Sequence, residues 1–142
     1  RKGRLAPCPS DASCFSTSAS GSPDKYISPW TFPEGVSSKD AAKQLVDYFN
    51  SSKDFFSVVK SQYPYLLVEY NGGAINGITD LEFLFREGDS TQAPFVTLRA
   101  MNRKSNQFYA FSGPSNNVKA ILNDTRTSLG WNTIVDADLF SR

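Results

Sequence analysis

The sequence contains no histidine, only two cysteines and almost no net charge. Histidine is the usual general base near neutral pH and the commonest metal ligand. Its absence therefore excludes Ser-His-Asp and Cys-His nucleophile systems, HExxH zinc sites and haem ligation by histidine. Two cysteines are too few for a zinc or iron–sulfur site made of cysteine alone. We therefore expect no metal, no cofactor and no catalytic centre.

Long apolar runs and an excess of one charge are also absent. Fifteen basic and fourteen acidic residues give a formal net charge of +1 over 142 residues. Such a chain creates no long-range field that would attract nucleic acid or an anionic membrane. No apolar run approaches the roughly 20 residues that cross a bilayer. We predict a protein that binds no nucleic acid and is at most peripheral to a membrane.

Aromatic residues are plentiful, and eleven of them are phenylalanine. With 39% apolar residues, the chain has the composition of one globular domain with an aromatic core. It starts with Arg-Lys-Gly-Arg rather than methionine. We interpret this start as that of a processed chain from which a targeting peptide has been removed.

Residues 1–36 combine serine and glycine with five prolines, a mixture that breaks helix and strand periodicity. We predict an irregular N-terminal arm. Its aromatic residues Tyr26, Trp30 and Phe32 are too dense for a free linker, so the arm should wrap over the domain. They either form an exposed docking surface for a partner or cover the domain's own core. Trp131 and the following C-terminal tail present the same two alternatives.

Residues 37–142 show the patterns of a single α+β domain. Apolar residues at helical spacing after a serine cap predict a helix over 38–50. A second helix should begin after the cap Ser115, with Pro114 just outside, and end at Gly130. Short β-branched and aromatic segments bounded by turn residues predict four strands, at about 55–60, 65–71, 77–87 and 94–102.

The predicted strands form antiparallel hairpins because Asn71-Gly72-Gly73 and Gly88-Asp89-Ser90 join them through short turns. Alternation along the third strand predicts one apolar face and one largely polar face. The expected fold is therefore α+β: an antiparallel sheet of about four strands with two helices packed on one face.

Several short motifs together resemble the domain-of-unknown-function 1499 family. They occur in the family's order and cover nearly the whole chain: Cys8-Pro9, Cys14 and Ser16, Ile27-Ser28-Pro29, Ile78-Thr79-Asp80-Leu81-Glu82-Phe83, and Thr97-Leu98-Arg99-Ala100 with Arg103. The family's Ser-Asp pair and Asn-Arg-Arg motif are replaced here by Phe108-Tyr109-Ala110-Phe111 and Ser115-Asn116-Asn117.

The resemblance implies a family found in bacteria and photosynthetic eukaryotes, whose plant and algal members are directed to the chloroplast. A processed chain of this kind fits the thylakoid lumen. The function we expect is non-enzymatic binding of a larger thylakoid membrane complex, a photosystem or its assembly intermediate. The alternative is a carrier of a small molecule, lipid or pigment in a cavity between sheet and helices.

Cys8 and Cys14 flank a short turn and are close enough in sequence to close a local disulfide loop. Two other states are open: a redox-active pair, for which CxxC spacing and a neighbouring base are missing, and two free buried thiols. A disulfide in so small a loop would constrain the arm and contribute modestly to global stability.

Asp80 and Glu82 lie two residues apart on one strand, so both point to the same face, where Arg99 and Arg103 can meet them. One interpretation is a paired-carboxylate acid/base site. The other is a set of cross-strand ion pairs on an exposed sheet face, which we favour because no third group accompanies them. Our hypothesis is that these charges orient a partner.

Overall fold

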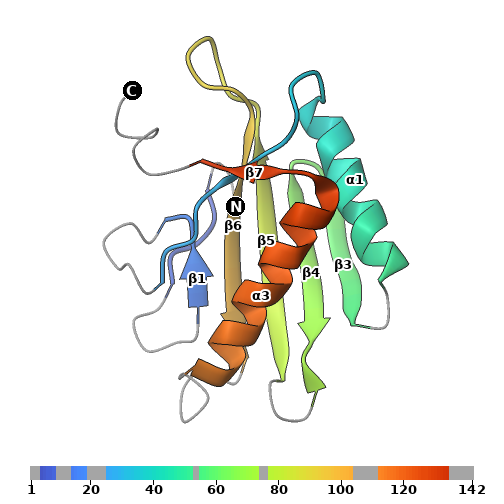
Figure 1. The fold of residues 1–142 in the computed structure, drawn as a ribbon, viewed down its shortest axis with the longest axis vertical. Helices are drawn as coiled ribbons and strands as arrows, with labels where there is room; N and C mark the ends of the chain where they lie inside the picture. Colours follow the sequence, from blue (N-terminus) through green and yellow to red (C-terminus); the bar gives the residue numbers. More distant parts are fainter. Residues whose placement is uncertain are drawn as a thin grey trace.

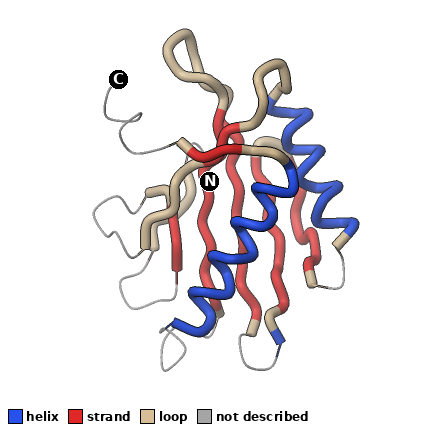
Figure 2. The backbone as a smooth tube through the Cα atoms, in the orientation of Figure 1, coloured by secondary structure: helices blue, strands red, loops and turns tan. Residues whose placement is uncertain are grey.

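The computed structural model describes residues 4–8, 14–18, 25–52, 55–73, 77–103 and 112–134, with only the backbone described for residues 112–117. Figure 1 shows a single sheet with two helices in front of it. In Figure 2 the strands form one layer and the helices lie across it.

The sheet has seven strands, all paired antiparallel in the order β3-β4-β5-β6-β2-β7, with β1 also pairing with β6. The strands are β1 (Cys14–Ser16), β2 (Trp30–Thr31), β3 (Phe56–Gln62), β4 (Tyr65–Asn71), β5 (Ile78–Arg86), β6 (Phe95–Asn102) and β7 (Asn132–Thr133). The described helices are α1 (Ser38–Ser51) and α3 (Ser112–Leu129).

The first helix forms where the sequence predicts it. The Ser37 side chain accepts a hydrogen bond of 3.0 Å from the backbone N–H of Asp40, which satisfies one of the free amides of the first turn. The Asp40 carboxylate also suits the positive end of the helix dipole. The apolar stripe Ala41, Leu45 and Phe49 is fully buried, so α1 is held to the sheet by these three side chains.

The second helix starts four residues earlier than predicted, at Ser112 instead of directly after the cap Ser115. Its end agrees with the prediction. Gly130 has a φ of +74°, a conformation that only glycine adopts without strain. The N–H of Trp131 donates to the carbonyl of Arg126 over 3.0 Å, as in a Schellman cap. This cap turns the chain so that Trp131 enters the core.

The expected architecture, a sheet of about four strands with two helices packed on one face and an irregular N-terminal arm, is wrong. The sheet has seven strands, and two of the additional ones, β1 and β2, come from the segment predicted to be irregular. The additional strands are only two or three residues long, so they cannot show the period-two alternation by which strands are recognised. The chain is mostly antiparallel sheet and only loosely α+β.

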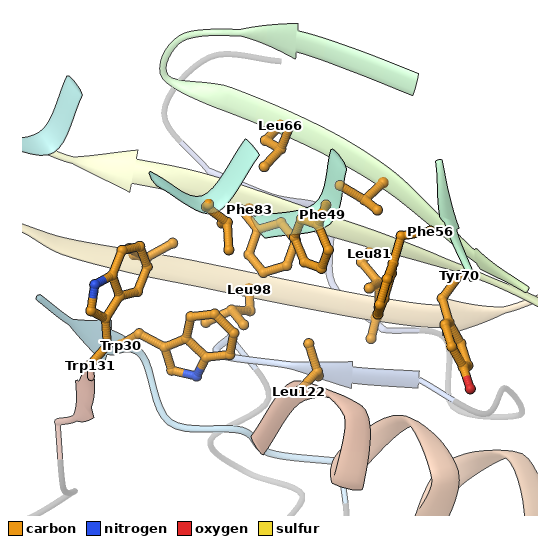
Figure 3. Close-up of a cluster of buried hydrophobic side chains, with 14 of the residues drawn as sticks. Trp30, Phe49, Phe56, Leu66, Tyr70, Leu81, Phe83, Leu98, Leu122 and Trp131 are labelled. Atoms are coloured by element: carbon orange, nitrogen blue, oxygen red, sulfur yellow. The ribbon is translucent and has the colours of Figure 1, made fainter. Parts of the chain in front are cut away.

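Eight of the eighteen residues in the buried hydrophobic cluster are aromatic, and several of their rings meet at its centre (Figure 3). The Phe83 ring lies 5.7 Å from both Phe49 of α1 and Trp30 of β2, measured between centroids. Trp30 also contacts the Trp131 ring edge-on at 6.2 Å. Such tilted and edge-on contacts are the favoured geometries of aromatic pairs. The core therefore joins the N-terminal segment, the central strand β5 and the end of α3.

Candidate functional site

The sheet face opposite the core carries most of the polar side chains of the central strands. Backbone register places Lys60, Leu67, Glu82 and Arg99 side by side across β3, β4, β5 and β6. A second row contains Glu69, Asp80 and Met101 and reaches Cys14 in β1. We call this surface the outer face.

Arg99 and Glu82 form a partly buried ion pair on the outer face. Arg99 Nη1 lies 3.1 Å from Glu82 Oε1, and the two side chains are only 15% and 21% exposed. Arg99 Nη2 also donates to the carbonyl oxygen of Pro7 at 3.4 Å. The ion pair thus connects strands β5 and β6 to the N-terminal segment.

Arg103 forms a second and more exposed cluster. Its Nε and Nη2 donate to the two carboxylate oxygens of Asp80 at 3.1 and 2.8 Å, and Nη2 also lies 2.6 Å from Glu69. The fork-like contact with Asp80 is the geometry that guanidinium and carboxylate groups favour. The Asp80 carboxylate, and after it that of Glu69, raises the pKa of the Arg103 guanidinium.

The structure brings together the four charged residues singled out in the sequence. Asp80 and Glu82 bind different arginines, so their arrangement is the cross-strand ion pairing that we favoured over a paired-carboxylate site. Among the described residues, no group of three or more His, Cys, Asp or Glu side chains is placed to hold a metal ion. The geometry provides fixed charges of both signs on a rigid sheet.

Tyr65 is a further member of the Glu82 cluster. Its hydroxyl donates a hydrogen bond to the Glu82 carboxylate. Burial, and then this hydrogen bond, raises the pKa of Tyr65 above its ordinary value of 10.0. Folding therefore favours the neutral phenol, and this contribution to stability is complete below pH 10.0 and is lost as the pH rises towards the folded-state pKa.

We predict that Tyr65 does not ionise when the pH of the folded protein rises through 10.0. The measurement is the ultraviolet absorbance of tyrosinate in an alkaline titration of the wild type and of Tyr65→Phe. The variant should show the same absorbance rise near pH 10.0 as the wild type, because Tyr65 does not ionise at that pH in the folded wild type. A rise that is smaller in the variant by the absorbance of one tyrosinate would contradict the prediction.

A hollow of about 600 Å³ opens on the outer face beside the Arg99 and Glu82 pair. Segment 4–6 forms one side, and strands β3 and β4 with their connecting turn form another. Its lining residues are Arg4, Leu5, Ala6, Lys60, Gln62, Tyr63, Pro64, Tyr65, Leu67, Glu82 and Arg99. This volume is within the range of small-molecule sites.

A disulfide between Cys8 and Cys14 tethers this N-terminal segment to the sheet, with the two α-carbons 5.7 Å apart. Of the three states considered from the sequence, the structure therefore has the disulfide. Cys14 lies in β1, opposite Met101 of β6. The bond fixes residues 4–8 close to Arg99, which Pro7 contacts directly.

The aromatic residues of the predicted arm belong mostly to the core. Trp30 is 2% exposed, so its side chain leaves no surface for a partner. Phe32 is partly buried against the Trp131 ring, with centroids 5.7 Å apart, and Tyr26 is also partly buried. Of the two alternatives, covering the domain's own core is the one that the structure supports. Residues 135–142 of the C-terminal tail lie outside the described residues.

A second hollow, of about 380 Å³, lies between α1 and the sheet, next to the turn that joins β3 and β4. It contains the aromatic residues Tyr63, Tyr65 and Phe85 together with two lysines of α1, Lys39 and Lys43. The Lys39 ammonium lies 5.8 Å from the Tyr63 ring centroid, a favourable cation–π distance.

Of the eleven residues that line the larger hollow, the sequence pointed only to Glu82 and Arg99. The residues it missed include Arg4, Leu5, Lys60 and Tyr65. Lys60 and Tyr65 could have been found by counting alternate residues outward from a two-residue turn at 63–64, which sets the register of the hairpin. Arg4 and Leu5 could not, because they reach the sheet only through a segment whose path the sequence leaves open.

The fold and the outer face define a small disulfide-bonded domain, built on one antiparallel sheet, that presents fixed charges and a hollow. The family described as a protein of unknown function, DUF1499, matches residues 4–108, and the chain belongs to this family. The matched residues include the outer-face arginines and end before α3. No curated protein and no solved structure matches the chain.

Within the described part of the chain, neither the length nor the hydropathy of any helix meets the requirements of a membrane span.

Proposed function

We propose that this protein is a non-enzymatic binding protein whose outer face contacts a larger thylakoid membrane complex, a photosystem or its assembly intermediate. The observation that carries the proposal is the mutual pairing of the outer-face charges, Arg99 with Glu82 and Arg103 with Asp80 and Glu69. Carboxylates held by arginines in this way present a fixed pattern of charge. Such patterns determine the specificity and association rate of protein complexes.

The Arg103 cluster is the part of this pattern best suited to a partner. Arg103, Glu69 and Asp80 are 48%, 33% and 31% exposed, so a partner can reach them without disrupting the fold. Arg99 and Glu82 are more buried and hold the strands together. We therefore place the main contact at Arg103 and its two carboxylates.

The thylakoid lumen is the proposed location. The support is the family resemblance, which implies chloroplast targeting of plant and algal members, and the Cys8–Cys14 disulfide, because such bonds persist in oxidising compartments. The protein would lie at the membrane surface through its partner.

A second candidate function is that of a carrier for a small molecule, lipid or pigment. The observation that favours it is the hollow of about 380 Å³ between α1 and the sheet, with its aromatic lining. A carrier would hold its ligand there without a stable association with a complex.

Native-gel co-migration of the endogenous protein and of variants tests the main proposal. The variant Glu69→Gln/Asp80→Asn/Arg103→Gln removes the exposed charges, and its two amide replacements keep the shapes of the carboxylate side chains. It should lose most co-migration with a thylakoid complex, because the specific charge pattern is gone. Deleting residues 1–36 is not a usable test, since it removes β1, β2 and Trp30 from the core.

The matched control is Lys43→Gln/Asp47→Asn, which removes an exposed charge of each sign from α1. It should co-migrate like the wild type. Wild-type migration of the triple variant would rule out the proposed contact. Native mass spectrometry of the same preparation, showing a stoichiometric ligand and no complex, would instead support the carrier.

A further inference from the structure

The large hollow on the outer face is lined by more cationic than anionic side chains. Its lining contains Arg4, Lys60 and Arg99 but only one carboxylate, that of Glu82. Glu82 is already paired with Arg99. Among the described residues no carboxylate forms an ion pair with Arg4 or Lys60. Within the described ranges, two cations therefore face the hollow without a counter-charge.

The same hollow also has an apolar part. Leu5 and Leu67 line it, and the Tyr65 ring lies beneath Lys60, whose ammonium is 5.7 Å from the ring centroid. Leu5 is itself buried, with 5% exposure, so segment 4–6 packs firmly on the outer face. A few fixed charges beside apolar and aromatic side chains are typical of sites for small ligands.

We propose that this hollow binds a small amphiphilic anion, an acidic head group attached to an apolar body. Arg4 and Lys60 would neutralise the head group, while Leu5, Leu67 and the Tyr65 ring would contact the apolar body. The volume of about 600 Å³ accommodates a molecule of this class. The proposal is independent of the proposed partner and differs in place from the carrier alternative, which uses the hollow beside α1.

The disulfide gives the site one of its walls. Arg4 and Leu5 come from the N-terminal segment, and the Cys8–Cys14 bond ties that segment to β1. Without the bond, the segment would be held mainly by its own contacts with the sheet. The affinity for the anion should therefore depend on the disulfide.

Binding of dodecanoate, followed by amide chemical shifts in NMR, tests the proposal. Saturable shifts are expected at Leu67 and Glu82, with a dissociation constant below about 1 mM. Decanol, a neutral probe with a similar apolar body, should bind about tenfold more weakly or worse. No saturable shifts, or shifts centred on Ala42 and Val46 of the hollow beside α1, would overturn the proposal.

Charge variants identify the residues that hold the head group. Arg4→Gln/Lys60→Gln should weaken dodecanoate binding by about tenfold or more. The matched control Lys39→Gln/Lys43→Gln removes two cations from the other hollow and should change the affinity by less than about twofold. The opposite ranking of the two variants, or equal affinities, would refute the assignment.

The variant Cys8→Ser/Cys14→Ser tests whether the affinity for the anion depends on the disulfide that ties the N-terminal segment to β1. It should bind dodecanoate about fivefold more weakly or worse, while its far-ultraviolet circular dichroism stays that of the wild type. Unchanged affinity in this folded variant would show that the disulfide is not needed to hold segment 4–6 at the site.

Discussion

Replacing Trp30 with alanine is expected to lower the free energy of unfolding by about 3–5 kcal/mol. Trp30 is 2% exposed and its ring contacts both Phe83 and Trp131. Removing it leaves a cavity at the point where the N-terminal segment, β5 and the end of α3 meet. The loss therefore combines the transfer free energy of an indole with the cost of that cavity.

Denaturant unfolding followed by circular dichroism measures this loss. The control is Phe55→Ala, because Phe55 is 60% exposed and its removal should change stability by about 0.5 kcal/mol or less. If Trp30→Ala proved as mild as Phe55→Ala, Trp30 would be outside the folding core, and the docking-surface interpretation of the aromatic arm would regain support.

The contrast between Trp30 and the central strands shows what the sequence could predict about the fold. Strands β3 to β6 have seven to nine residues each, long enough for alternation to reveal them, and their predicted bounds are within a residue or two of the structure. Strand β2 has two residues. It belongs to the sheet because it pairs with β6 and β7, and the local sequence pattern does not predict this tertiary pairing.

The candidate site likewise has one part that the sequence could predict and one part that it could not. The pairing of Glu82 with Arg99 follows from strand alternation and hairpin register, so the sequence could place these side chains on one face. The hollow beside them requires segment 4–8, whose Pro7 is 92 residues from Arg99 in the chain. Contacts between residues so far apart in the sequence depend on the path of the chain, which the spacing of apolar residues does not predict.

The disulfide could be predicted only in part from the sequence. Spacing alone was compatible with a local loop, but it left a redox-active pair and free thiols open. The structure shows the bond and also what it does: it holds Pro7 near Arg99 and Leu5 over the outer face. A small loop of this kind contributes only about 2 kcal/mol to stability, so its main effect is local positioning.

The two outer-face arginines should differ in what their removal costs. Arg99→Ala is expected to lower the free energy of unfolding by about 2–3 kcal/mol, because it leaves Glu82 partly buried without its cation. Arg103→Ala should cost only about 0–1 kcal/mol, since Arg103 is 48% exposed and water can replace its contacts.

A double-mutant cycle with Arg99→Ala and Glu82→Gln separates this pairing from the other contacts of each residue. A coupling energy of about 1–2 kcal/mol is expected, because the two groups meet at 3.1 Å with little exposure. A coupling near zero would mean that Arg99 acts mainly through Pro7. The guanidinium of Arg99, and not its ion pair with Glu82, would then hold the N-terminal segment, and the wall that segment 4–6 gives the hollow would depend on the contact between Arg99 and Pro7.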